Sequence, residues 1–315
     1  MVQIDDPKAQ LLAVWHTGNG GLTMAMHGLD RDGAPEPDVA KKMLEDIGGT
    51  WWNVYMGGPE SGGSGWSPEL LRQYEDRGIS DFLLSYVGRQ SGHVSRLTVS
   101  QGEQDGAEAC QLAAWFGFAA AGTPVCLDLE GRTYDAAPTA SLDYAGAWCH
   151  AVRSHGFRAG VYSNPRALIP LHERPNRPDW VWVASWVKHT ADSGADPHEA
   201  SGIKDDLWPE VGQRAWQYAG TFGDGTCSIR GLPVDIDVAD SGVLASSGAT
   251  GTGPVQDPGG HPVPHSYTVQ PGDTLSGIAA KLHTPGGWEA IFRLNQDVIG
   301  PDPDRISAGE ILKLP

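Results

Sequence analysis

Strand-like apolar segments alternate with helix-like segments through the first 240 residues, and this alternation is the strongest constraint on the fold. The strand-like segments are 22–30, 50–58, 81–88, 124–131, 158–165, 180–186, 214–220 and 233–240. Helical patterns at 34–48, 67–78, 106–122 and 139–156 separate the first five strands. The helical patterns between the later strands are weaker. The order predicts an α/β fold, a (β/α)8-type TIM-like barrel that can be irregular in its second half. A doubly wound open sheet is the alternative, but no G-x-G-x-x-G motif follows the first strand.

One change of composition divides the chain. Residues 244–265, LASSGATGTGPVQDPGGHPVPH, consist mainly of Gly, Pro, Ser, Thr and Ala. Such a segment cannot bury enough apolar surface to fold, so it is predicted to be a linker. We therefore predict a barrel domain over 1–242, a linker over 243–265 and a small βααβ domain over 266–315.

Charge and apolar content exclude several classes of protein. The formal net charge of −17 disfavours a general binder of nucleic acid or anionic membranes, since both ligands require a basic surface. No apolar stretch reaches the length of about 18 residues that a membrane-spanning helix needs. The first 18 residues lack the basic and long apolar regions of an ordinary signal peptide, so the protein is expected to be made in the cytoplasm without one.

Cysteine and histidine spacing predicts no metal site. The four cysteines contain no C-x-x-C pair, and no H-E-x-x-H motif occurs among the eleven histidines. Cys126 and Cys149 lie in apolar patterns and are predicted to be buried free thiols. We expect neither a structural metal nor a cofactor.

Polar and aromatic side chains lie at the predicted strand ends, where the reactive groups of a βα barrel gather. Carboxylates come from three strands: Asp30 from the first, Asp128 and Glu130 from the fourth, and Asp235 from the eighth. The residues predicted to bind substrate are Tyr55, Tyr162, Trp186, Gln217, Tyr218 and Asp237. The aromatic members of this set suit stacking against sugar rings.

Asp128 and Glu130 follow the apolar run PVCLDLEG and are separated by one residue. In an extended strand they project to the same side, with Cα atoms roughly 6.6–7 Å apart. Mutual repulsion and partial burial would raise the pKa of one carboxyl and leave the other ionised, which is the division of roles that glycoside cleavage uses. A lone D-x-E is more often a solvated strand end, but carboxylates from three strands at one barrel mouth favour an active site.

The order of motifs resembles glycoside hydrolase family 25, the lysozyme-type muramidases, and more closely the divergent glycoside-hydrolase-like barrels of actinobacterial wall-associated proteins. The matching segments are GLD at 28–30, VCLDLEG at 125–131, GVYSNP at 160–165, VWVASW at 181–186, WQYAG at 216–220 and VDIDV at 234–238. The resemblance implies that Glu130 is the general acid. It also implies that Asp128 assists at the anomeric centre or orients the substrate's N-acetyl group, with Asp30 and Asp235 as the two further acidic residues of the site.

Three departures from the muramidase pattern favour the glycoside-hydrolase-like branch, whose barrels can bind glycan without cutting it efficiently. The first strand is followed by RDGAP rather than the usual pattern, and the second ends in VYMGG where muramidases carry a lysine. Asp237 stands where muramidases usually have asparagine.

The last 50 residues resemble a LysM module through the opening YTVQPGDTLSGIAAKL. Asp273 and Thr274 also form a helix-capping signal. The resemblance implies glycan binding through two loops, Gly272, Asp273, Thr274 and Leu275 in one and Ile299, Gly300, Pro301 and Asp302 in the other. Trp288 is interpreted as core rather than as a sugar platform.

The leading hypothesis from the sequence is a peptidoglycan hydrolase that cuts the β-1,4 bond between N-acetylmuramic acid and N-acetylglucosamine. Peptidoglycan glycan strands are the expected partner, with no nucleic acid and no membrane insertion. A non-catalytic peptidoglycan-binding protein stays open as an alternative. So does a lysin or structural component of a phage tail or contractile injection particle. The expected place of action is the bacterial cell wall, reached by lysis or on a particle.

Overall fold

The computed structural model of the protein describes most of the chain between residues 15 and 313. The described residues are 15–18, 21–59, 61, 65–89, 91–188, 191–192, 194–200, 202–204, 207–209, 212–220, 227–246, 266–269, 272–281, 287–307 and 309–313. Most of the predicted linker, residues 247–265, lies outside them.

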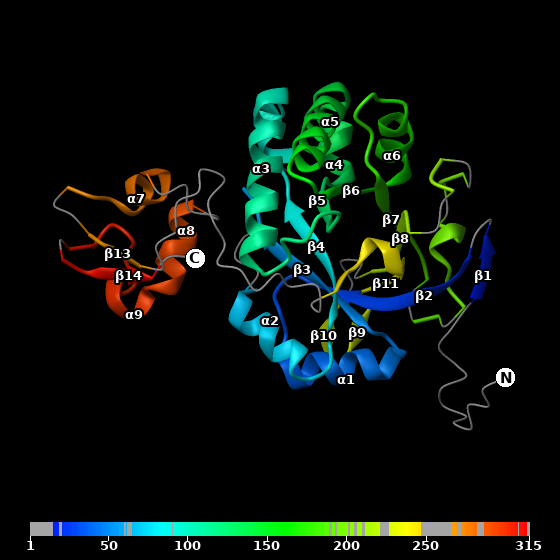
Figure 1. Cartoon of the computed structure of the whole chain (residues 1–315), viewed down its shortest axis with the longest axis horizontal. Coiled ribbons are helices and arrows are strands. Elements are labelled where there is room, and N and C mark those ends of the chain that lie inside the picture. Colours follow the sequence, from blue (N-terminus) through cyan, green and yellow to red (C-terminus); the bar gives the residue numbers. More distant parts are fainter. Residues whose placement is uncertain are drawn as a thin grey trace.

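Within the described residues, eight strands pair in a closed ring (Figure 1). They are β2 (Gly21–Asp30), β3 (Trp51–Gly57), β4 (Asp81–Val87), β5 (Pro124–Asp128), β6 (Arg158–Ser163), β7 (Trp180–Lys188), β8 (Arg214–Ala219) and β11 (Asp235–Asp240). Each strand pairs with the next, and β11 also pairs with β2. The predicted barrel is therefore confirmed, with all eight strands near their expected positions.

The last barrel strand runs against the others. Pairing is parallel from β2 to β8, whereas β11 is antiparallel to both β8 and β2. Asp235 at the start of β11 is consequently opposite Asp30 at the end of β2. We call this end of the barrel the mouth: it contains the carboxyl ends of the parallel strands and the amino end of β11.

Helices cover the outside of the barrel (Figure 1). They are α1 (Pro37–Ile47), α2 (Pro68–Glu75), α3 (Val99–Trp115), α4 (Gly131–Ala136), α5 (Pro138–Ser154) and α6 (Pro165–His172), with the 3-10 turn η2 (Ser91–Arg96) before α3. Between β7 and β8 the described residues form only the turn η3 (Pro197–Glu199), and a small hairpin, β9 (Ser228–Ile229) with β10 (Leu232–Pro233), lies between β8 and β11. The second half is thus irregular.

Local capping signals set the helix starts. The Ser67 hydroxyl accepts a hydrogen bond from the Leu70 amide at 3.1 Å and starts α2 as predicted. The predicted helix 106–122 was placed too late along the chain. Thr98 accepts from the Gln101 amide at 3.1 Å and starts α3 at Val99, and the helix ends before Gly117, whose φ of 98° is left-handed.

Large aromatic side chains fill the barrel below the mouth, and glycines on neighbouring strands make room for them. A Cβ atom on Gly28 would lie 2.1 Å from the ring of Trp51, and one on Gly160 would lie 2.1 Å from the ring of Trp180. Both tryptophans are fully buried. The buried thiol predicted for Cys126 packs in this interior cluster, and Cys149 is buried in the core outside the barrel.

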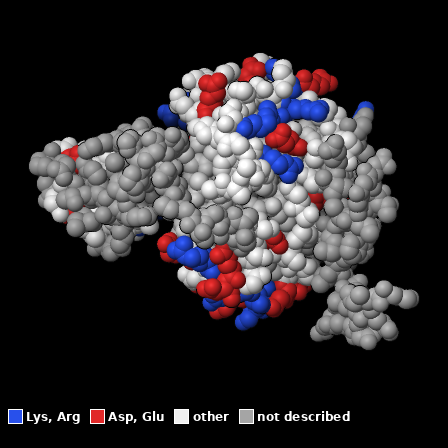
Figure 2. Space-filling view, viewed as in Figure 1, with Lys and Arg blue, Asp and Glu red and all other residues white. Residues whose placement is uncertain are grey.

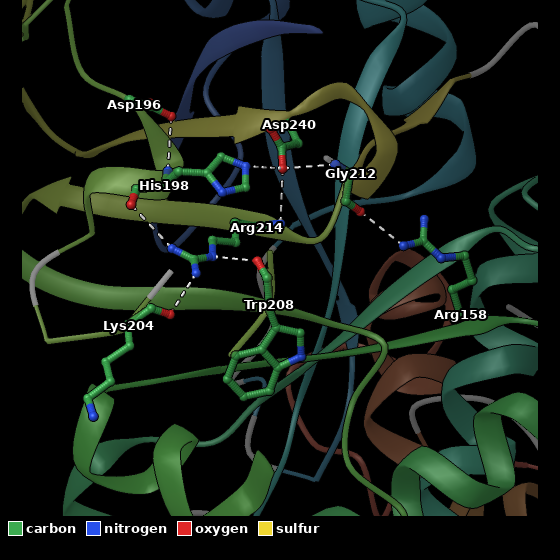
Figure 3. Close-up of polar contacts among 8 residues, drawn as sticks. All are labelled: Arg158, Asp196, His198, Lys204, Trp208, Gly212, Arg214 and Asp240. Carbon is green, nitrogen blue, oxygen red and sulfur yellow. Dashed lines mark hydrogen bonds and ion pairs between the residues drawn. The ribbon is translucent and has the colours of Figure 1, made fainter. Parts of the chain in front are cut away.

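A polar network closes the end of the barrel opposite the mouth (Figure 3). The guanidinium of Arg214 is fully buried and donates to the carbonyl oxygens of Trp208, His198 and Lys204 at 2.8, 3.3 and 2.9 Å. Asp240 accepts from the amides of Gly212 and Arg214 and lies 3.0 Å from the His198 ring. Because these contacts join β8, β11 and the segment between β7 and β8, they hold in place a part of the barrel that lacks a covering helix.

Residues just after β11 still belong to the packed barrel. The turn η4 (Ser241–Val243) leads into β12 (Ala245–Ser246), which pairs with β4, and β1 (Trp15–Gly18) pairs with β2. Val243 and Leu244 are buried in the interior cluster that contains Cys126, and Ala245 is buried in the core outside the barrel. Residues 243–246, which the predicted division assigned to the linker, therefore pack with the barrel.

The C-terminal residues form a unit with its own core. Its elements are β13 (Ser266–Thr268), α7 (Leu275–Lys281), α8 (Gly287–Leu294), α9 (Gln296–Ile299) and β14 (Ile311–Lys313), and β13 pairs with β14. Val269, Ile278 and Ile291 are buried in that core, and Trp288 packs against it as interpreted from the sequence. The βααβ order is confirmed, with α9 as an added turn.

Surface charges of both signs mix on the face shown in Figure 2. Exposed ion pairs join Arg72 to Glu69 and Arg77 to Asp38. Among the described residues, no helix combines the length and apolarity that crossing a membrane requires.

Candidate active site

Strand alternation brings the predicted acidic residues to one place. Successive strand residues face opposite sides, so Asp30, Asp128 and Asp237 share the interior side with Gln217 and Tyr162. Hydrogen bonds across the mouth join these strands. The barrel mouth is therefore the candidate active site.

Asp30 is almost fully buried and is surrounded by donors. It accepts hydrogen bonds from Asn53 Nδ2 at 2.9 Å, from the Tyr55 hydroxyl at 3.1 Å and from Gln217 Nε2 at 3.0 Å. Burial and the nearby Asp235 raise the pKa of Asp30 to about 7, while the Asn53 and Tyr55 donors oppose that rise. Asp30 therefore changes protonation near neutral pH.

Asp128 and Glu130 differ in their access to water. Asp128 is 9% exposed, and its Oδ1 atom is buried without a hydrogen-bond partner among the described residues. Burial, Glu130 and Asp30 raise the pKa of Asp128 well above its ordinary value. Glu130 is exposed at the mouth, yet partial desolvation also raises its pKa, against the lowering effect of Arg132. Glu130 is thus a solvent-accessible carboxyl that holds its proton more tightly than usual.

The strand that carries this pair is shorter than predicted. β5 ends at Asp128, and Glu130 is the residue immediately before α4. The backbone nevertheless stays extended, because the Leu129 amide donates to the Tyr162 carbonyl at 3.1 Å and Glu130 has φ −58° and ψ 139°. The predicted D-x-E alternation therefore continues past the strand end.

Two further carboxyls come from β11. Asp235 accepts from Gln217 Nε2 at 3.2 Å. Asp237 is fully buried; its Oδ1 accepts from Trp182 Nε1 at 2.9 Å, and its Oδ2 has no partner among the described residues. Burial, followed by the charges of Asp30 and Asp235, raises the pKa of Asp237 well above its ordinary value. Burial and like charges in the acidic cluster therefore favour the protonated form of its buried carboxyl groups.

The structure brings most of the predicted substrate-binding residues to the mouth. Tyr55 bonds to Asp30, and Tyr162 and Trp186 both bond to Gln217, at 2.9 and 2.7 Å. It does not bring Tyr218 there. Tyr218 follows Gln217 directly and so faces the other side of β8, where its buried hydroxyl accepts from the Asp192 amide.

Three site residues were not predicted: Asn53, Ser85 and Trp182. Ser85 donates to Asn53 at 2.5 Å, which leaves the Asn53 amide nitrogen directed at Asp30. Trp182 orients Asp237. Asn53 stands two residues before Tyr55, so these polar side chains share one face of β3, and Ser85 is a polar residue within the apolar strand β4. These were the available signals for Asn53 and Ser85.

The predicted glycan-binding residues of the C-terminal unit fall into two groups. Leu275 and Ile299 are buried in its core, whereas Thr274, Pro301 and Asp302 are exposed, and Asp273 is partly buried. Thr274 accepts from the Gly277 amide at 3.1 Å, so its capping role is present. Gly272 and Gly300 have φ of 87° and 79°, which fits glycine at both loop turns.

Two family models match the chain. The model described as "Rv2525c-like, glycoside hydrolase-like domain" matches residues 46–239, more than half of the chain. The LysM domain model matches residues 267–315. No curated protein matches the sequence.

Three solved structures are similar to this chain at low sequence identity. An uncharacterized B. stearothermophilus protein is 16% identical with a TM-score of 0.51, covering 68% of this chain and 96% of its own. The catalytic domain of endolysin ply40 from bacteriophage P40 of Listeria monocytogenes is 14% identical, with a TM-score of 0.43 and coverages of 70% and 95%. The Streptococcus pneumoniae virulence factor GHIP, a glycosyl hydrolase 25, is 13% identical, with a TM-score of 0.44 and coverages of 68% and 86%.

The fold and the matched residues agree with the resemblance drawn from the sequence motifs. The barrel contains the glycoside-hydrolase-like match, and the C-terminal unit contains the LysM match. The chain belongs to the Rv2525c-like glycoside-hydrolase-like family and carries a C-terminal LysM domain.

Proposed function

We propose that the barrel hydrolyses peptidoglycan glycan strands at the β-1,4 bond between N-acetylmuramic acid and N-acetylglucosamine. One observation carries the proposal: Glu130 is an exposed carboxyl with a raised pKa beside the buried carboxyls of Asp128 and Asp30. Cleavage of a glycosidic bond needs such a proton donor at the leaving oxygen.

In this proposal Glu130 protonates the leaving oxygen as the glycosidic bond breaks. Water then adds to the anomeric carbon and gives a proton back to the ionised Glu130. Asp128 then has one of two roles: stabilising positive charge at the anomeric carbon, or orienting the substrate's acetamido group. Its raised pKa and its unpartnered buried oxygen favour the second role, because a neutral carboxyl can donate a hydrogen bond but gives little charge stabilisation. Asp30 and Asp235 support the site from the adjoining strands.

In this proposal the LysM domain binds insoluble peptidoglycan and keeps the barrel close to it. A binding module joined by a linker raises the effective concentration of its partner domain at the surface. The predicted division, with the linker shortened to residues 247–265 because residues 243–246 pack with the barrel, forms part of this proposal. We expect limited proteolysis to cut the chain within residues 247–265 and to leave both flanking fragments intact.

The deciding experiment is digestion of purified peptidoglycan by wild type and Glu130→Gln. We expect wild type to release new reducing ends and the variant to be about 10²–10⁴-fold slower, the contribution typical of a general acid. Glu45→Gln, the same change at an exposed position on α1, should behave as wild type. Equal rates for wild type and Glu130→Gln would exclude the proposed mechanism.

A non-catalytic glycan-binding barrel is the second candidate. The observation that favours it is the number of carboxyls with raised pKa values, Asp128 and Asp237 among them, since neutral carboxyls can bind sugar hydroxyls without cleaving a bond. It predicts retention on insoluble peptidoglycan with no soluble fragments released. A place in a phage tail or injection particle is a separate prediction, tested by co-purification with particles.

A further inference from the structure

Gln217 is buried at the centre of the mouth and makes hydrogen bonds through both ends of its amide. Its side chain is 1% exposed. Nε2 donates to Asp30 Oδ2 at 3.0 Å and to Asp235 Oδ2 at 3.2 Å. Oε1 accepts from the Tyr162 hydroxyl at 2.9 Å and from Trp186 Nε1 at 2.7 Å. Both donors and both acceptor positions of the amide are used, so none is left for a substrate.

The surrounding groups fix the orientation of this amide. The Trp186 indole nitrogen can only donate, so it requires Oε1. Nε2 then carries the two hydrogens that the Oδ2 atoms of Asp30 and Asp235 accept. Rotating the amide by 180° would place a donor against the indole N–H and an oxygen against two carboxylates.

Trp186 is held from two sides and still presents a surface to solvent. Its indole nitrogen is bonded to Gln217, and its ring lies so close to Gly220 that a Cβ there would be 2.5 Å from a ring atom. The side chain is 38% exposed. Two fixed contacts beneath an exposed indole create a preformed stacking platform at the edge of the acidic cluster.

We propose that Gln217 is a positioning residue, not a substrate contact, and that its amide holds the Trp186 platform and the Asp30–Asp235 pair as one unit. A sugar ring of an N-acetylated glycan would stack on Trp186, and the same amide would keep the acidic pair in fixed register with that sugar. The identity of the sugar rests on the proposed function; the hydrogen-bonded unit does not.

This arrangement has a consequence for titration. Among the described residues, the titratable groups that face Asp30 are Asp235 and Asp237 from β11, Tyr55 from β3, Tyr162 from β6, Cys126 and Asp128 from β5, and Glu130 after β5. Against these acidic neighbours, an N–H donor stabilises the ionised form of Asp30. Loss of the Gln217 donor should therefore raise the Asp30 pKa further.

The test replaces Gln217 by methionine, which has similar length and no amide. Carbon-13 NMR of the aspartate carboxyls should show the Asp30 pKa rising by about one unit, the size expected for one lost bond to a charged group. The Trp186 indole N–H resonance should shift in the same variant, while the indole signals of buried Trp51 and Trp180 stay in place and report an intact fold. Affinity for an N-acetylglucosamine oligosaccharide should fall several-fold.

Gln217→Glu provides a second variant that keeps the side-chain shape. It should also raise the Asp30 pKa and shift the Trp186 indole resonance, whereas Gln73→Glu, the same change at an exposed position on α2, should alter neither. If affinity falls in the folded Gln217 variants while both signals are unchanged, Gln217 is a substrate contact and the proposal is wrong.

These signals do not depend on catalysis. A wild-type protein that releases no reducing ends, together with the expected NMR shifts, would overturn the hydrolase function and leave the positioning role intact. An active wild-type enzyme, together with unchanged Asp30 and Trp186 signals in the variants, would support the hydrolase function and overturn the positioning role of Gln217.

Discussion

Asp235 is the residue directly opposite Asp30 in the antiparallel pairing of β11 with β2. Like charges opposed on neighbouring strands repel, and this repulsion adds to burial in raising the pKa of Asp30 to about 7. The pair is tolerated because Gln217 donates one amide hydrogen to each carboxyl.

Asp235→Asn should lower the Asp30 pKa from about 7 toward the ordinary value of 3.8, because it removes the neighbouring negative charge. Carboxyl NMR titration measures this directly. In an active enzyme that needs Asp30 ionised, the acidic limb of the pH–rate profile should move to lower pH. Asp32→Asn, at an exposed position near Asp30, serves as the control; equal effects of the two substitutions would contradict the prediction.

Asp237→Asn should stabilise the protein at alkaline pH. The pKa of Asp237 is raised on folding, so the folded state binds its proton more tightly than the unfolded state. Wild-type stability from this group is full below the unfolded pKa and is lost as pH rises through the folded pKa. Asparagine resembles the protonated form and removes that loss.

Thermal unfolding from pH 4 to pH 9 measures the effect. The melting temperature of the variant should exceed that of wild type increasingly as pH rises, by about 2–4 °C for each kcal/mol regained. The two proteins should converge near pH 4. A difference independent of pH would show that Asp237 does not titrate as described.

Two helical glycines should respond oppositely to alanine. In α5, a Cβ on Gly146 would come no nearer than 3.8 Å to another residue, so Gly146→Ala should stabilise the protein by about 0.4–1 kcal/mol. In α3, a Cβ on Gly102 would lie 2.4 Å from the Tyr144 carbonyl oxygen, so Gly102→Ala should destabilise it by about 1–3 kcal/mol. Denaturant unfolding measures the change in the free energy of unfolding for each variant. Changes of the same sign would contradict the close approach of α3 to α5.

Arg214→Met should destabilise the fold by about 3–5 kcal/mol. The substitution leaves the carbonyls of His198, Lys204 and Trp208 without their charged donor in a buried region. Arg72→Met, which removes an exposed pair with Glu69, should change stability by less than about 0.5 kcal/mol. Urea unfolding of both variants tests whether the network of Figure 3 holds the barrel together.

The barrel was predictable from sequence because each strand is a short apolar run between turn or helix signals. The direction of β11 was not, since alternation of residues is the same read in either direction. The start of α3 was placed too late for a different reason: Gly102 weakens the helical pattern of the first turns, yet it is where the helix packs closely against α5.

The acidic part of the candidate site was predictable because carboxylates at strand ends are conspicuous. Gln217 and Tyr218 show the limit. Both are polar and adjacent, but only one of two consecutive strand residues can face the interior, and the sequence did not say which. Arg214 was missed because its partners are backbone carbonyls, which leave no sequence pattern.

The reversed strand β11 also links assembly of the site to closure of the cylinder. A nascent chain that has reached residue 234 contains seven barrel strands and an open edge on each side, between β2 and β8. Insertion of residues 235–240 seals both edges and, in the same event, delivers Asp235 and Asp237 to the mouth. Closure of the barrel and assembly of the acidic site therefore depend on the same strand, and a chain truncated before that strand would lack both.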